Sequence, residues 1–293
     1  MNWQLVGINA GIALVSVVLI FGVRALIAYF STKDYFDKHV RAAQVLGFQE
    51  RQVPVRDGLV LNVAEGPPGD TPLLLIPGQG SVWQEYCKTL PHLSQDFHVL
   101  VVDVHGHGKS TWDPVDYTAD QIAEDLAELV QQVFAEPALV AGHPSGGLIA
   151  AVMAARHPEQ VRGVLFEDPL FFSTEPDRVP KTYVGIDAYP SVESFLSQDQ
   201  ERDWVCWYMP RSYQAQTLRA ITCPTVFLKA TTRYDREGNL LAALSDEDLA
   251  RVEQLLRNNR TIRVRSSHDV HFARTSAYVA ALRQLSAAAG DRH

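Results

Sequence analysis

The amino-acid sequence predicts an α/β protein, with a doubly wound, mostly parallel sheet and a helical cap inserted after the sixth strand. Three observations lead to this fold class. Short, wholly apolar runs recur along the chain, segments with helical periodicity lie between them, and one aromatic-rich segment interrupts the alternation. Short apolar runs suit strands that are buried on both faces of a parallel sheet. Repeated alternation of strand and helix implies a doubly wound arrangement.

The first two predicted strands form a hairpin, because Arg56-Asp57-Gly58 separates Gln52–Val55 from Leu59–Ala64 and Asp-Gly is a strong turn signal. The remaining six strands are predicted from the apolar runs Leu73–Ile76, Val99–Val102, Ala138–Ala141, Gly163–Phe166, Thr225–Leu228 and Thr261–Val264. Helical periodicity or composition predicts four helices, over Ala119–Phe134, Gly147–Arg156, Asp246–Leu256 and Ser276–Leu285. Ser245 is a candidate N-cap for the third of these helices.

The segment from Leu170 to Thr222 breaks this alternation and is rich in aromatic residues, proline and charge. We interpret it as a helical cap that roofs a substrate pocket; a surface excursion with its own small core is the alternative. The predicted α/β domain covers residues 49–286, with the cap at about 170–222. Residues 287–293 are predicted to form a loose tail.

The N-terminal residues 1–30 are predicted to form a transmembrane helix. Leu5–Val23 contains no charged side chain and has about the length that crosses a hydrocarbon core. A cleavable signal peptide would need a basic residue before the apolar run, and a buried core helix would usually carry a polar face. The basic residues follow the span and are Arg24, Lys33, Lys38 and Arg41. The sequence thus predicts a single-pass membrane protein with a juxtamembrane linker over 31–48 and a cytoplasmic catalytic domain.

The overall composition limits the classes of partner and cofactor. The chain of 293 residues has 34 acidic and 26 basic side chains, and its net charge is −8. This acidic balance gives no basic face for nucleic acid. The three cysteines (Cys87, Cys206 and Cys223) are far apart and suggest neither a disulfide framework nor a metal site. No metal or organic cofactor is expected.

Four motifs carry the chemical information, and each follows or joins a predicted strand. Pro77-Gly78-Gln79-Gly80 follows the third strand, and Asp103-Val104-His105-Gly106-His107-Gly108-Lys109-Ser110 follows the fourth. Gly142-His143-Pro144-Ser145-Gly146-Gly147 joins the fifth strand to an Ala-rich helix. Ser266-Ser267-His268-Asp269-Val270-His271 follows the last strand. Because they are only two positions apart in a loop and no acidic cluster is nearby, His105 and His107 are interpreted as structural rather than as metal ligands.

In their order and strand contexts, these motifs resemble the α/β-hydrolase fold family, of the esterase, lipase and C–C hydrolase type. The resemblance covers Gln49 to Leu285. It implies a serine nucleophile on a sharp strand-to-helix elbow of the form G-x-S-x-G. It also implies that the backbone N–H groups of Gln79 and Gly146 form the oxyanion hole.

The elbow departs from the family pattern, because Pro144 occupies the nucleophile position. Proline offers no nucleophile and fixes φ near −65°, whereas the elbow apex has a strained, positive φ. Two alternatives follow. In the first, the strand runs one residue further, Pro144 is extended, and the apex moves to Ser145. In the second, the elbow is inactive.

The resemblance gives His268 as the catalytic base, with His271 as the weaker candidate, and places the acid after a strand. Asp235 follows the seventh strand and is the favoured acid; Asp168, after the sixth strand, is the alternative. The sequence therefore predicts a membrane-anchored serine hydrolase with a Ser145, His268 and Asp235 triad. Its predicted substrate is an apolar or amphipathic small-molecule acyl compound. The alternative from another class is a catalytically impaired protein that binds small molecules or partners.

Overall fold

One eight-stranded sheet organises the described part of the chain. The computed structural model describes residues 21–25, 37–78, 80–112, 118–169, 171–172, 211–231 and 244–290. The strands are β1 (Gln49–Arg56), β2 (Leu59–Glu65), β3 (Pro72–Ile76), β4 (His98–Asp103), β5 (Ala138–Gly142), β6 (Val161–Glu167), β7 (Thr225–Ala230) and β8 (Asn259–Val264). Each contains one of the eight predicted strands, so the predicted fold class is confirmed.

The strand order across the sheet is β1-β2-β4-β3-β5-β6-β7-β8. The β1–β2 hairpin is antiparallel, as predicted, and β2 also pairs antiparallel with β4. All other neighbouring strands are parallel. Gly58 has a φ of +77° in the hairpin turn, a conformation that L side chains rarely adopt. Because β3 to β8 are parallel, the loops that follow them gather at one edge of the sheet, where sites of open α/β sheets form.

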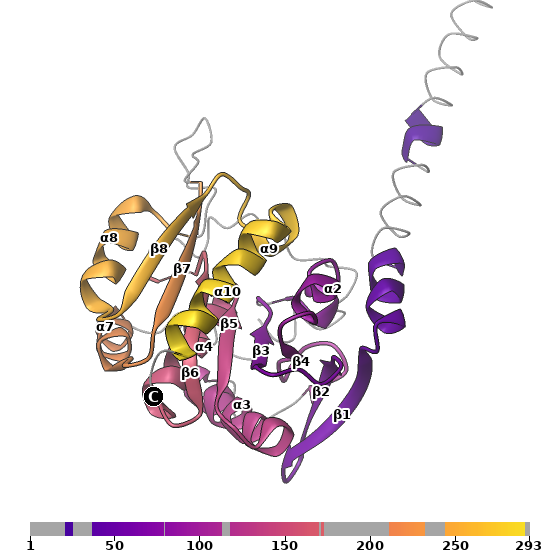
Figure 1. Ribbon diagram of the computed structural model, residues 1–293, viewed down its shortest axis with the longest axis horizontal. Coiled ribbons are helices and arrows are strands. Elements are labelled where there is room, and N and C mark those ends of the chain that lie inside the picture. The colour runs from indigo at the N-terminus through magenta and orange to yellow at the C-terminus, as the bar shows by residue number, and fades with distance from the viewer. Residues whose placement is uncertain are drawn as a thin grey trace, which may run out of the picture.

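Helices cover both faces of the sheet (Figure 1). They are η1 (Trp83–Tyr86), α2 (Leu90–Leu93), α3 (Ala119–Phe134), α4 (Ser145–Arg156), α7 (Arg211–Ala220), α8 (Asp246–Leu255), α9 (Val270–Ala273) and α10 (Thr275–Gly290). Consecutive side chains of β3 show the two layers. Leu74 and Ile76 join the core beneath α3, α4, α7 and α8, whereas Leu73 and Leu75 join the core beneath η1, α2, α9 and α10.

Two helices begin with side-chain caps. The Thr118 hydroxyl accepts the N–H of Gln121 at the start of α3, and Ser245 accepts the N–H of Asp248 at the start of α8. The Ser245 cap agrees with the prediction. In α10 the helix continues to Gly290, so the predicted loose tail is helical over its first four positions. Residues 291–293 lie outside the described part.

The predicted single-pass membrane location is contradicted. Among the described residues, no helix is both long and apolar enough to cross a bilayer. Of residues 1–30, the structure describes only 21–25, as a helical turn. Within the predicted linker, residues 37–45 are helical, and the buried Ala43 joins the core that contains Phe48.

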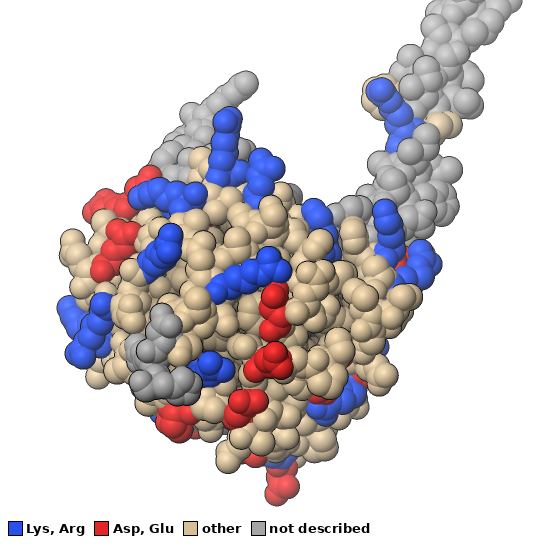
Figure 2. Space-filling view, in the orientation of Figure 1, with Lys and Arg blue, Asp and Glu red and all other residues tan. Residues whose placement is uncertain are grey.

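Most of the predicted cap lies outside the described residues. Its final ten or so residues form α7, which contacts α4 and α8. Within this stretch Gln214 is buried and accepts the backbone N–H of Phe172 over 2.7 Å. On the face shown in Figure 2, acidic and basic side chains are interspersed.

Candidate active site

The strand-to-helix turn after β5 packs against the end of β3 with no room for side chains. A Cβ added to Gly142 would lie 2.2 Å from the carbonyl oxygen of Gly146, and one added to Gly146 would lie 2.3 Å from that of Ile76. Both distances are shorter than any real contact of a Cβ. The glycines of the elbow motif therefore permit the close approach of β3, β5 and α4.

The backbone of this turn differs from the shifted elbow predicted from the sequence. Strand β5 ends at Gly142, and Pro144 has helical dihedral angles (φ −69°, ψ −40°) instead of extended ones. Residues 142–147 contain no positive φ. Ser145 is therefore the first residue of α4, where it is buried. Proline is readily accommodated here because its fixed φ already matches a helix start.

Of the two predicted oxyanion donors, only Gly146 lies within the described residues. The N–H of Gly146 donates to the carbonyl oxygen of His143 over 3.0 Å, and that of Gly147 donates to Pro144 over 3.2 Å. These two bonds tighten the first turn of α4. Gln79 lies outside the described residues. Its neighbour Gly78 lies against the turn, since a Cβ on Gly78 would be 2.7 Å from Cδ of Pro144.

His268 pairs with the carboxylate that follows β6. Its Nδ1 lies 2.8 Å from Oδ2 of Asp168. Asp168 is fully buried, and its backbone has a φ of +40°, held by a 2.9 Å hydrogen bond from its N–H to the carbonyl oxygen of Leu228. The buried Lys229 Nζ lies 3.5 Å from Oδ1 of the same carboxylate. The structure thus brings together the predicted base and the alternative acid, while Asp235 lies outside the described residues.

His271 is part of a second, deeper pair. Its backbone N–H donates to Glu167 Oε1 over 2.7 Å, and its Nδ1 lies 2.9 Å from the same oxygen. The Tyr86 ring packs 4.5 Å from the imidazole. Burial alone would lower the pKa of His271, but the Glu167 carboxylate raises it above its usual value. His271 thus anchors α9 to the end of β6.

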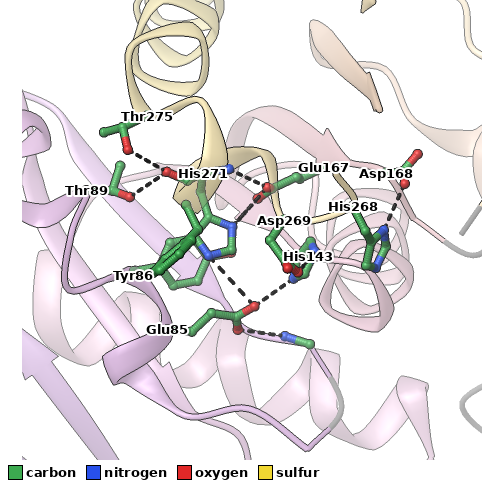
Figure 3. Close-up of polar contacts among 12 residues, drawn as sticks. Glu85, Tyr86, Thr89, His143, Glu167, Asp168, His268, Asp269, His271 and Thr275 are labelled. Atoms are coloured by element: carbon green, nitrogen blue, oxygen red, sulfur yellow. Dashed lines mark hydrogen bonds and ion pairs between the residues drawn. The ribbon is translucent and has the colours of Figure 1, made fainter. Parts of the chain in front are cut away.

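His143 lies between these two pairs (Figure 3). Its Nδ1 is 2.8 Å from Glu85 Oε1, its Nε2 is 3.4 Å from Asp269 Oδ1, and its ring centroid is 4.6 Å from that of His268. Burial would lower the pKa of His143, but Glu167 and Glu85 outweigh it and raise the pKa to about 10. For Glu85 itself burial would raise the pKa, yet His143 lowers it to about 2.

The three imidazoles share one pattern. In each, Nδ1 is held by its own carboxylate, and the pairs are His143 with Glu85, His268 with Asp168, and His271 with Glu167. Such anchoring fixes the orientation of the ring and directs Nε2 away from the carboxylate.

Part of this constellation was not predicted from the sequence. No role was assigned to His143, Glu85 or Asp269. The position of Asp269, next to the predicted base, was a weak signal. Glu85 had none, because it reaches the site from η1, on the loop after β3.

The fourth-strand motif has a structural role, as predicted. The Asp103 carboxylate accepts the N–H of Trp83 over 2.7 Å and the side-chain amide of Asn62 over 2.8 Å. A Cβ on Gly108 would lie 2.1 Å from Asp103 Oδ2. His107 Nε2 accepts the N–H of Gly80 over 3.0 Å, so this imidazole stabilises the loop after β3, which follows Gly78.

Comparison with known proteins agrees with this architecture. Residues 71–191 match the model of the alpha/beta hydrolase fold family. Lipase LipV of Mycobacterium tuberculosis is 33% identical over 107 residues, which are 36% of this chain and 39% of the relative. The bifunctional esterase/perhydrolase DCH of Acinetobacter calcoaceticus is 32% identical over 141 residues, covering 44% and 50% of the two chains. The matches to these curated relatives therefore span half of their length or less.

A solved structure of a putative lipase from Acinetobacter baumannii has a TM-score of 0.70 at 17% identity, covering 89% of this chain and 97% of that one. At this identity the likeness is one of fold. Together with the family match over residues 71–191 and the sheet topology, it shows that the chain has the α/β-hydrolase fold.

Proposed function

We propose that the chain is a hydrolase of esters or related acyl compounds, with Ser145 as nucleophile, His268 as general base and Asp168 as the orienting acid. The observation that carries this proposal is the 2.8 Å pairing of His268 Nδ1 with the fully buried Asp168. A base held in one tautomer by a buried carboxylate, beside the turn into α4, is the arrangement that acyl transfer uses.

In the proposed reaction, His268 Nε2 accepts the proton of the Ser145 hydroxyl as Oγ attacks the carbonyl carbon. Asp168 stabilises the resulting imidazolium. The tetrahedral intermediate collapses, and the leaving alcohol takes the proton from His268. Water then hydrolyses the acyl-enzyme with the same base. Because Ser145 begins α4, the positive end of the helix dipole favours negative charge at its oxygen.

The oxyanion would be held by the N–H groups at the ends of β3 and β5, as the family pattern implies for Gln79 and Gly146. In the described structure the N–H of Gly146 is engaged with the carbonyl oxygen of His143. Its use therefore requires that the first turn of α4 open when substrate binds, so that the N–H of Gly146 is released from His143 and can donate to the oxyanion. Catalytic hydrogen bonds often form fully only in the bound complex.

The ester-like substrate class is supported by the names of the relatives, which include a lipase and an esterase/perhydrolase. Substrate choice in this proposal depends on the segment after β6, because the catalytic groups at the sheet edge do not discriminate among acyl compounds.

The test is covalent labelling of the full chain with a fluorophosphonate, followed by peptide mass spectrometry. We expect an adduct on Ser145 that is absent from Ser145→Ala. Ser94→Ala is the matched control, because Ser94 is the C-cap residue of α2 and its hydroxyl donates to the carbonyl oxygen of Pro91. If Ser145→Ala hydrolyses a chromogenic ester as fast as the natural chain does, Ser145 is not the nucleophile.

A second candidate function, non-catalytic binding of a small molecule, is favoured by one observation. Pro144 stands at the nucleophile position of the motif with helical dihedral angles. If the chain only binds, Pro144→Ser should create ester hydrolysis where the natural chain has none. If the serine hydrolase proposal holds, the natural chain hydrolyses the ester and Pro144→Ser lowers that activity by disturbing the start of α4.

A further inference from the structure

We propose that His143, His268 and Asp269 form a binding site for a divalent transition-metal ion such as Zn²⁺. One potential ligand atom from each of these residues lies within 4.8 Å of the others. Two imidazoles and one carboxylate are a common ligand set for such ions, and they leave coordination positions open for water.

The first support is a buried nitrogen without a hydrogen bond. His143 is 3% exposed, and its Nε2 makes no hydrogen bond within the described part of the chain. Asp269 Oδ1 lies 3.4 Å from this nitrogen. Ligand atoms about 2.0–2.1 Å from a tetrahedral Zn²⁺ are separated by about 3.3 Å, so this spacing fits two ligands of one ion.

The second support is the orientation of the two imidazoles. Glu85 holds Nδ1 of His143 and Asp168 holds Nδ1 of His268, each at 2.8 Å. The Nε2 atoms are thereby left as the ligand nitrogens. A carboxylate on the far nitrogen is the outer-shell partner that metal-bound histidines almost always have.

In a neighbouring group, one potential ligand atom each of Glu85, His143 and His271 also lies within 4.8 Å of the others. It is the weaker candidate, because Glu85 Oε1 and His143 Nδ1 already bond to each other over 2.8 Å. An ion there would have to replace that bond. At the proposed site no such bond is lost, and the partial exposure of His268 (22%) and Asp269 (36%) gives the ion a path from solvent.

The local charge favours a cation. Four carboxylates surround the three imidazoles, and they are Glu85, Glu167, Asp168 and Asp269. When no metal ion is bound, a proton on His143 offsets part of the negative charge of these carboxylates. An ion on Nε2 of His268 would also occupy the nitrogen that accepts the serine proton. The proposed site therefore predicts that Zn²⁺ inhibits ester hydrolysis.

The test measures binding without substrate, so it does not depend on the proposed catalytic function. Metal-free full-length protein is titrated with Zn²⁺ by calorimetry, and Co²⁺ absorption reports the coordination geometry. We expect one site that takes up Zn²⁺ in the micromolar range, and a Co²⁺ spectrum typical of four or five ligands. Absence of binding up to 1 mM Zn²⁺ would overturn the proposal.

The variants separate this site from other histidines. Asp269→Asn keeps the shape of a partly exposed side chain, and we expect it to weaken Zn²⁺ binding at least as much as the ~10–100-fold loss typical of outer-shell changes. His157→Gln is the matched control, because His157 lies 3.1 Å from Glu124 on the surface, away from the site. The proposal would be overturned if Asp269→Asn bound Zn²⁺ as tightly as the natural chain does. It would also be overturned if only His157→Gln lost affinity for Zn²⁺. Ser145→Ala should bind Zn²⁺ as the natural chain does even where its turnover is lost, which separates failure of the catalytic proposal from failure of the metal site.

Discussion

Replacing Asp168 by asparagine should abolish most of the turnover by changing the tautomer of His268. Oδ2 of Asp168 lies 2.8 Å from His268 Nδ1, and the carboxylate is fully buried. Asparagine has the same shape but no charge, and its amide can present N–H to the ring. The proton then moves to Nε2, which can no longer act as a base. The equivalent change in a serine protease triad costs ~10⁴ in kcat, so we expect a loss of about 10³–10⁴-fold, or ~4–5.5 kcal/mol.

The same substitution should also destabilise the fold, and this effect can be separated from catalysis. Lys229 Nζ is buried 3.5 Å from Oδ1 of Asp168, so removing the carboxylate leaves a buried ammonium with less compensation. Breaking a buried pair in this way costs about 3–5 kcal/mol. Adding Lys229→Met to Asp168→Asn should restore much of the free energy of unfolding, because the unpaired charge is gone. It should not restore turnover.

The assay is hydrolysis of a short-chain p-nitrophenyl ester, measured beside urea denaturation for each variant. Asp235→Asn is the matched comparison, since Asp235 was the acid favoured from the sequence. A folded Asp168→Asn protein that keeps turnover within about threefold, with a large loss in Asp235→Asn, would refute the role given to Asp168.

Three further predictions concern the frame of the site. Gly146→Ala should cost about 3 kcal/mol or more in urea denaturation, because its Cβ would lie 2.3 Å from the carbonyl oxygen of Ile76; an unchanged midpoint would contradict the packing. Burial lowers the pKa of His107 from 6.5 to about 4, so the unfolded chain takes up a proton first as the pH falls. Stability should therefore fall by about 3 kcal/mol between pH 6.5 and 4, and His107→Gln, which can still accept the N–H of Gly80, should lose that component of the pH slope. Thr118→Ala should cost about 1 kcal/mol by removing the cap of α3, and no change in the denaturation midpoint would exclude the cap.

The sequence predicted the sheet well because its central strands, β3 to β7, are buried on both faces. The run Leu73–Ile76 has no polar side chain, and it becomes β3, in which alternate residues enter the two cores. The helix α3 was predicted with the bounds that the structure gives it, because its apolar positions follow helical spacing and Thr118 caps it. Short elements such as η1 and α9 were not predicted, since four residues contain too little periodicity.

The prediction of a membrane span over Leu5–Val23 was based on hydropathy alone, and it is contradicted, because among the described residues no helix is long and apolar enough to cross a bilayer. An apolar run indicates that a segment avoids water, but it does not indicate what covers that segment.

The active site was harder to predict because its parts come from separate loops. The pairing of His268 with Asp168 depends on the parallel alignment of β6, β7 and β8, which brings the loops after them together. The position of Asp235 after the seventh strand made it the favoured acid instead. The anchoring of His143 by Glu85 depends on η1, which lies beyond the Pro77-Gly78-Gln79-Gly80 motif in the loop after β3.

The most direct test of the proposed active site is the rate at which a fluorophosphonate labels Ser145 in the natural chain and in His268→Gln. The account predicts a single adduct on Ser145 that forms at least about 100-fold more slowly in the variant, since general-base assistance contributes about 10²–10⁴-fold. Labelling of another serine, or equal rates in the two proteins, would contradict it.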